Sequence, residues 1–198
     1  MKILIASNNK HKLTEFQSIF KTLDNIKFLT PKDLNIEIEI EENGTTFEEN
    51  SIIKAEKYFE IAQIPTIADD SGLIVAGLNN KPGVYSARYA GYGATDKLNR
   101  QKLLENIKLK GLIEPKAKFI CIICFYDGNN KYIFNGECKG KIINEERGNN
   151  GFGYDPIFVP NSFSLTFAEL DSEIKNKISH RAKALEKFKI FINEYLKN

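Results

Sequence analysis

Four kinds of short polar segment interrupt the apolar pattern of this sequence and carry side chains suited to phosphate and metal chemistry. The first, Ser7-Asn-Asn-Lys-His-Lys12, follows an apolar run at residues 2–6 and precedes a helical pattern. A helix N-terminus offers backbone N–H groups and the positive end of the helix dipole. With hydroxyl, amide and lysine donors beside it, this segment can cradle a polyphosphate, although it lacks the spacing of a Walker loop. The alternative is an ordinary polar turn with solvated lysines.

Paired acids form the second segment type, at Glu41-Glu42 and at Asp69-Asp70, where predicted strands end. Strand ends of an α/β sheet are a common place for ligand sites, and two carboxylates there can hold Mg²⁺ beside a phosphate. Lys54, on the helix predicted between the pairs, is placed to neutralise phosphate charge. Alternatively, the acids are solvated strand ends and Lys54 is a surface residue. The Asp69-Asp70 pair is the more specific signal, because acids beside an apolar strand are costly without a cation or hydrogen bonds.

A glycine-rich segment, Gly148-Asn-Asn-Gly-Phe-Gly-Tyr-Asp155, is the third. Glycine lacks a Cβ, so backbone of this kind can approach a ligand closely. Phe152 stands between two glycines, and an exposed ring at that position suits stacking on a nucleobase. The alternative is a flexible loop with Phe152 folded into the core.

The fourth segment, Ser179-His-Arg181, opens the last predicted helix. Only four of the 28 basic residues are arginine, so an arginine beside a histidine indicates that donor geometry matters there. Arginine presents a rigid fork of donors, which suits the keto oxygen of a purine and rejects an amino group. The alternative is a surface arginine near the start of a helix.

Composition excludes several other classes of protein. A net charge of +2 gives no basic footprint for a nucleic-acid polymer, and two histidines are too few for an imidazole zinc site. Three cysteines in 198 residues build no disulfide framework, so we expect a cytoplasmic protein. Cys121 and Cys124 lie three apart on a predicted strand and point to opposite faces, which indicates two core residues. The longest apolar run, residues 119–126, is too short to cross a membrane.

Hydrophobic periodicity predicts the elements that position these segments. We expect strands at residues 2–6, 26–29, 36–40, 66–69, 73–76, 117–127, 131–143 and 157–159, and helices at 13–23, 46–62, 95–109 and 180–196. The two strand pieces at 66–76 would flank a turn at Asp69–Gly72. Strands and helices alternate and a hairpin follows, so the sequence predicts an α/β fold with a mixed sheet. The length fits one large domain or two small lobes.

Taken together, these segments resemble the inosine triphosphate pyrophosphatase family, whose members hydrolyse deaminated purine nucleoside triphosphates. The resemblance covers nearly the whole chain. Its motifs follow in the family's order, as Ala6–Lys12, Thr46–Asn50 with Lys54-Ala55, Ala68–Leu73, Pro82–Tyr89, Gly151–Pro156 and Lys175 through Ile178–Arg181. Two features depart from the pattern. Asn8 stands where a glycine often precedes the asparagine, and Lys177 competes with Lys175 for the same role.

The resemblance implies a role for each site residue. Asp70 and Lys54 would be catalytic, and Glu42 and Asp70 would hold Mg²⁺. The implied substrate contacts are Ser7, Asn8, Asn9, Lys10, His11, Lys12, Ser71, Phe152, Gly153, Tyr154, Asp155, Lys175, His180 and Arg181. Of these, the first six would form the triphosphate loop, Phe152 would stack on the base, and Lys175, His180 and Arg181 would read the purine edge.

The resemblance also implies an architecture and a reaction. The fold would be an elongated mixed sheet flanked by helices, a single domain over residues 1–198 with two lobes and a central cleft, and usually a homodimer. The expected reaction is hydrolysis of ITP, dITP and XTP to the monophosphate and pyrophosphate. Two alternatives stay open: a pyrophosphatase for pyrimidine or other modified nucleotides, and a non-catalytic nucleotide sensor.

Overall fold

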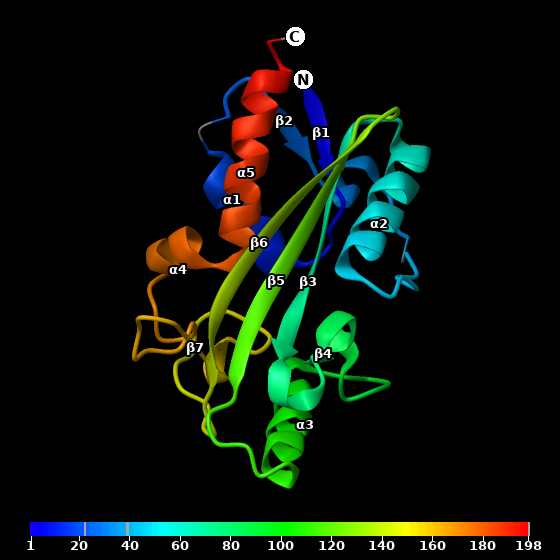
Figure 1. Ribbon diagram of the computed structural model, residues 1–198. Helices are drawn as coiled ribbons and strands as arrows, with labels where there is room; N and C mark the ends of the chain where they lie inside the picture. Colours follow the sequence, from blue (N-terminus) through cyan, green and yellow to red (C-terminus); the bar gives the residue numbers. More distant parts are fainter. Residues whose placement is uncertain (22, 39, 198) are drawn as a thin grey trace. The chain divides into compact units, whose positions relative to one another are not determined.

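The computed structural model of the chain describes residues 1–21, 23–38 and 40–197 (Figure 1). Helices are formed by α1 (Lys10–Phe20), α2 (Phe47–Ala62), α3 (Asp96–Leu109), α4 (Ser172–Ile178) and α5 (His180–Tyr195). Strands are formed by β1 (Lys2–Ile5), β2 (Lys27–Leu29), β3 (Thr66–Val75), β4 (Lys81–Pro82), β5 (Lys116–Tyr126), β6 (Lys131–Ile142) and β7 (Phe158–Pro160). Short 3-10 turns lie between them at Pro31–Leu34, Ala76–Leu78, Gly83–Arg88 and Asp155–Ile157.

The strands form a mixed sheet in the order β2-β1-β3-β5-β6-β7, with β4 paired to β3. β1 runs parallel to β2 and to β3, whereas the pairs β3–β4 and β6–β7 are antiparallel. This confirms the predicted α/β class. The chain divides into two compact units: unit 1 is Met1–Asp70, Cys121–Gly136 and Arg181–Asn198, and unit 2 is Ser71–Ile120 and Glu137–His180.

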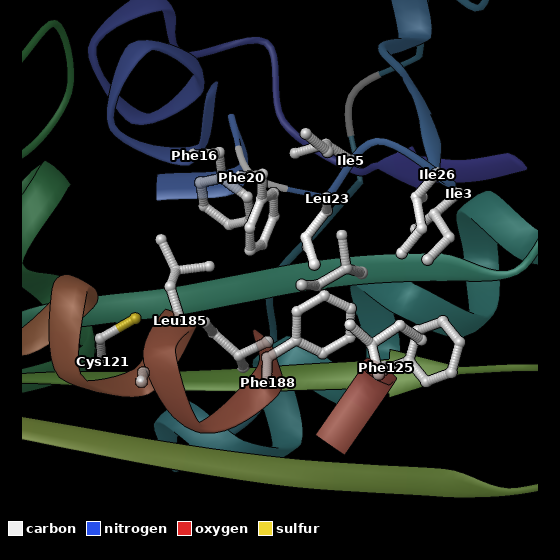
Figure 2. Close-up of a cluster of buried hydrophobic side chains, with 14 residues drawn as sticks. Ile3, Ile5, Phe16, Phe20, Leu23, Ile26, Cys121, Phe125, Leu185 and Phe188 are labelled. Carbon is white, nitrogen blue, oxygen red and sulfur yellow. The ribbon is translucent and has the colours of Figure 1, made fainter. Parts of the chain in front are cut away.

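In unit 1 both faces of β1 are buried, because its side chains alternate between two apolar clusters. Ile3 and Ile5 join a cluster with α1 and α5, and Leu4 packs on the other face with Ala55 and Tyr58 of α2. Figure 2 shows the first cluster, in which the rings of Phe20 and Phe188 lie 5.5 Å apart. Leu185, Phe188 and Ile192 are fully buried there, as the helical spacing of the last segment predicts.

Unit 2 has its own core. Leu103 and Ile107 of α3 pack with residues of β3, β5 and β6 and with Phe158 and Phe167. Thr95 caps the N-terminus of α3 by accepting a hydrogen bond from the Leu98 amide. This core supports α3 directly beside the glycine-rich segment, as described below.

Two predicted elements differ from the structure. The predicted strand at 36–40 is wrong: Ile36, Ile38 and Ile40 are half-buried against the α2 cluster, but the described part of the segment forms no strand, and Glu39 lies outside the described residues. Alternating burial here reflects packing of a loop rather than sheet pairing.

The predicted turn at Asp69–Gly72 is also wrong, because β3 runs without a break from Thr66 to Val75. Buried cations compensate the acids of this strand, so the chain has no need to turn towards water. The sequence analysis also missed the short helix α4. Among the described helices, none combines the length and the apolar character that a membrane crossing requires.

Candidate active site

The predicted phosphate segment connects β1 to α1 in unit 1. Asn9 is the N-cap of α1, and its Oδ1 accepts hydrogen bonds from the amides of His11 at 3.0 Å and Lys12 at 3.1 Å. Two of the helix N-terminal amides that we expected to face a phosphate are therefore already engaged. The side chains of Lys10 and His11 are exposed, whereas Lys12 is half-buried and reaches towards β3.

Asp69 of β3 is the centre of the charge network in unit 1. Its side chain is only 1% exposed, and Oδ2 lies 3.0 Å from Nζ of Lys12 and 3.1 Å from Nη2 of Arg181. Burial opposes ionisation of this carboxyl, but the charges of Lys12, Arg181 and Lys54 outweigh burial and hold its pKa well below the usual range. Asp69 is therefore a structural anion that ties the phosphate segment to β3.

Asp70, Glu42 and Lys54 form a second charged group beside that network. Nζ of Lys54 is 2.6 Å from Oε1 of Glu42 and donates to the carbonyl oxygen of Asp69 at 2.9 Å. Burial disfavours the charged lysine, but Glu42, Asp69 and Asp70 overcome this and raise its pKa. Lys54 is thus a permanent cation facing carboxylates, in agreement with the location that its place on α2 predicts.

Asp70 is held in a defined orientation. Its Oδ2 accepts a hydrogen bond of 3.0 Å from Nδ2 of Asn50, one helical turn before Lys54 on α2. Burial raises the pKa of Asp70, Lys54 opposes that rise, and the negative charge of Glu42 adds to it. The sequence analysis placed Asn50 in the motif Thr46–Asn50 but assigned it no role.

The donor set of Glu42 and Asp70 fits a hard divalent cation shared with a substrate. The negative charge of Glu42 disfavours ionisation of Asp70, so a cation beside Asp70 would relieve a repulsion already present. Within residues 1–21, 23–38 and 40–197, no group of three or more histidine, cysteine or acidic side chains is arranged to hold a metal. Two oxygen ligands completed by water and phosphate are typical of Mg²⁺.

Arg181 is bound by carboxylates of unit 1. Its side chain is 2% exposed, and Nη1 donates to Oε2 of Glu15 at 2.5 Å while Nε and Nη2 donate to Asp69. These carboxylate partners all belong to unit 1. The role of Arg181 in reading a purine edge stays a prediction, and Glu15 is a partner that the sequence analysis missed.

In unit 2 the glycine-rich segment wraps around the carboxylate of Asp155. Oδ2 of Asp155 accepts hydrogen bonds from the amide of Phe152 at 2.8 Å and from Nζ of Lys175 at 2.7 Å. Gly151 has φ of +76°, and a Cβ at this position would overlap Oδ2 of Asp155. Glycine is therefore required at 151 both by the backbone conformation and by the close approach of the carboxylate.

Lys175 of α4 lies beside Phe152 of the glycine-rich segment. The ammonium of Lys175 is 5.1 Å from the ring centroid of Phe152, and the lysine is buried. Lys177 is exposed, so it is Lys175 that accompanies the ring. Phe152 itself is half-buried, which leaves part of the ring accessible for stacking.

The other predicted contacts of unit 2 have varied surroundings. Tyr154 is buried in the core, and its hydroxyl donates to the carbonyl oxygen of Ser86 at 2.8 Å. The ring of His180 stacks on Phe119 with centroids 4.7 Å apart. Ser71 is half-buried on β3. For Tyr154, His180 and Ser71 alike, substrate contact stays a prediction.

The two strand cysteines behave as predicted. Cys121 packs in the cluster with α1 and α5, whereas Cys124 packs on the opposite face with α2. Burial raises the pKa of both thiols, that of Cys124 to about 12. Both are therefore unreactive core residues.

Comparisons with known proteins place this chain among close relatives. The model of the Ham1 family matches residues 3–191. Relatives named dITP/XTP pyrophosphatase from Nautilia profundicola and Coxiella burnetii are each 44% identical to it; the former match covers 94% of both chains and the latter 98% of both.

Solved structures agree. A HAM1 protein from Coxiella burnetii has a TM-score of 0.90 and 43% identity, with 98% of this chain and 99% of that chain covered. The Ham1 protein of Staphylococcus aureus has a TM-score of 0.87 and 38% identity, with 98% and 100% covered. With a family match over almost its full length and relatives this similar in sequence and in structure, the chain belongs to the Ham1 family.

Proposed function

We propose that this chain hydrolyses deaminated purine nucleoside triphosphates, namely dITP, ITP and XTP, to the monophosphate and pyrophosphate. The observation that carries the proposal is the group of Asp70, Glu42 and Lys54, in which two carboxylates face one permanent cation. The names of the relatives support the substrate class, since they are dITP/XTP pyrophosphatases. A protein that only binds a nucleotide needs no general base, so the presence of Asp70 beside Glu42 and Lys54 favours an enzyme over a sensor.

The proposed metal is Mg²⁺, held by Glu42 and Asp70. When bound, it would neutralise charge on the phosphate oxygens and orient the triphosphate for attack. Lys54 would add a fixed positive charge, because its pKa is raised. Lys10 and His11, both exposed in the segment after β1, would contribute further donors to the triphosphate.

Asp70 is the proposed base. Asn50 holds one oxygen of its carboxylate, and burial raises its pKa towards the range in which a carboxylate accepts a proton from water. A water molecule oriented by Asp70 would attack the α-phosphorus, and pyrophosphate would leave. Asp69 would take no part in proton transfer, because three cations hold it in the ionised form.

Base recognition is assigned to the surroundings of Phe152. The half-buried ring would stack on the purine, and Lys175 beside it would present a donor to the base edge. Donors facing the purine O6 would meet an acceptor in hypoxanthine and xanthine but an amino group in adenine. Mismatched polar groups of this kind give strong discrimination. His180 and Arg181 belong to the same proposed reading set.

We further propose that residues 1–198 act as a single pyrophosphatase domain of two lobes, as a homodimer in the cytoplasm. The match to the Coxiella burnetii relative, which covers 98% of each chain, supports a domain that spans both units. Light scattering tests the dimer directly.

Hydrolysis in H₂¹⁸O with Mg²⁺ tests the proposed reaction. Attack on the α-phosphorus puts the label into dIMP, whereas attack on the β-phosphorus puts it into pyrophosphate. We expect label in dIMP alone, no turnover without a divalent cation, and no turnover by Asp70→Asn. The matched control Asp24→Asn, at an exposed position of the same unit, should keep full activity. Label in pyrophosphate, or an active Asp70→Asn variant, would refute the assignment.

A further inference from the structure

The backbone N–H and C=O groups of Gly153 are both bound by side chains of α3. Its amide donates to Oδ2 of Asp96 at 2.7 Å, and its carbonyl oxygen accepts from Nη1 of Arg100 at 2.8 Å. Asp96 and Arg100 are four residues apart and lie on one face of the helix. The helix therefore forms hydrogen bonds with both polar backbone groups of the residue that follows Phe152.

Arg100 is well placed for this contact. Its side chain is 12% exposed, and Nη2 pairs with Oε2 of Glu146 at 2.8 Å, which fixes the plane of the guanidinium. Hydrogen bonds from a charged donor or to a charged acceptor are stronger and shorter than neutral ones. Asp96 stands in the first turn of α3, directly after the cap residue Thr95, so its position is also well defined.

Gly153 has no side chain through which packing could fix its position. Gly153 has φ of +61°, and a Cβ built on it would meet nothing within 4 Å. No packing at the Cβ position holds this residue, whereas the two hydrogen bonds to α3 do. The amide of Phe152 itself donates to Asp155, so the backbone is held by hydrogen bonds before and after the Cα that carries the ring.

We propose that Asp96 and Arg100 are positioning residues that set the orientation of Phe152 before a base binds. This rests on the proposed function, in which Phe152 stacks on the purine. A loop that is already in its bound orientation loses less conformational entropy when the ligand arrives, so affinity rises. We call these two contacts with Gly153 the clamp. The clamp acts on binding of the base and does not change the chemistry at Asp70.

The test uses the absence of tryptophan from the sequence. Phe152→Trp places the only tryptophan of the chain in the loop, and its anisotropy and quenching by iodide, with excitation selective for tryptophan, report on order and accessibility. In this background Arg100→Met should lower the anisotropy, increase quenching, and raise KM for dITP about tenfold with kcat within about twofold. Asp96→Asn should change anisotropy, quenching and KM in the same direction. Arg100→Lys should change them less than Arg100→Met does, because it keeps a charged donor. The matched control Lys102→Met removes a charge from an exposed position of the same helix and should change nothing.

The outcomes separate the two claims. If the fluorescence of the Phe152→Trp parent does not respond to dITP, the stacking role of Phe152 fails, and the proposed function loses its base contact. If that fluorescence responds to dITP but Arg100→Met and Asp96→Asn leave anisotropy, quenching and KM unchanged, the clamp fails while the proposed function stands. A fall in kcat with unchanged KM would also overturn the clamp, because it would place Arg100 in the chemical step.

Discussion

Arg181 and Asp69 form a buried ion pair although 112 positions separate them in the sequence, with Nε and Nη2 at 3.2 and 3.1 Å from the same carboxylate oxygen. The pair joins the first turn of α5 to β3, next to the proposed base Asp70. Glu15 on α1 binds the other end of the guanidinium. Arg181, one of only four arginines in the sequence, therefore connects α5 with β3 and α1 in unit 1.

Removing one partner of this pair should be costly. Arg181→Met leaves Asp69 and Glu15 buried with less compensation, and we expect a loss of about 3–5 kcal/mol in the free energy of unfolding. Urea denaturation measures this loss. Arg147→Met, at a half-exposed arginine, should cost less than about 1 kcal/mol.

A double-mutant cycle with Asp69→Asn isolates the pairwise term. The combined loss for Arg181→Met and Asp69→Asn should be smaller than the sum of the single losses by at least about 1 kcal/mol. Additive losses would mean that the two side chains do not stabilise each other.

Lys54 offers a test of the charge proposed to face the phosphates. Lys54→Met should lower kcat by about 10²–10³ and leave the fold intact, because a preorganised cation near developing charge supplies that much. The control is Lys57→Met on the same helix, whose exposed ammonium pairs with Glu60. Steady-state kinetics and circular dichroism are the measurements. Comparable losses in both variants would assign the effect to α2 as a whole rather than to the site.

Asp127 predicts a pH dependence of stability. Burial opposes its ionisation, but the amides of Asn130 and Asn129 and the hydroxyl of Tyr195 outweigh burial and lower the pKa below 3.8. A carboxyl whose pKa is lowered by folding stabilises the native state above its unfolded pKa, and the contribution disappears as pH falls through the folded value. Asp127→Asn should therefore be less stable than the parent by on the order of 1 kcal/mol at pH 7, with the difference shrinking below about pH 4.

Thermal unfolding from pH 7 down to pH 3 checks this, with Asp24→Asn at an exposed position as the reference. A difference between Asp127→Asn and the parent that stays constant over this range would show that the hydrogen bonds do not depend on the charge.

Two glycines of one loop separate steric overlap from backbone strain. Gly151 and Gly153 both have positive φ, so alanine at either position costs about 1 kcal/mol in backbone energy. Only at Gly151 would the Cβ also overlap the carboxylate of Asp155. Gly151→Ala should therefore raise KM for dITP at least about tenfold, and Gly153→Ala about twofold or less. Equal effects would show that the contact with Asp155 does not shape the loop.

Much of the fold follows from local physics in the sequence. Thr46 and Thr95 cap their helices as hydroxyl residues before a helical pattern do, and Leu185 and Phe188 bury the predicted face of α5. The prediction of a strand at 36–40 was wrong because isoleucines at every second position can be buried equally well along a loop. The period of two reports alternating burial and not the presence of a partner strand.

The site was only partly predictable, for a different reason. Asp70, Lys54 and Phe152 stand out by residue type beside strands, helices or glycines. Glu15 does not, and neither does the pairing of Asp69 with Arg181, since both acids compensate a buried guanidinium that the topology brings from far along the chain. Partners of this kind depend on which elements pack together. The spacing of residues within one segment does not predict such partners.

The most direct test of the account is product analysis with dITP and dATP side by side, in the presence of Mg²⁺. The account predicts that wild-type protein releases one pyrophosphate and one dIMP per dITP, with kcat/KM at least about 100-fold above that for dATP. Equal turnover of dITP and dATP, release of orthophosphate in place of pyrophosphate, or binding of dITP without any turnover would contradict it.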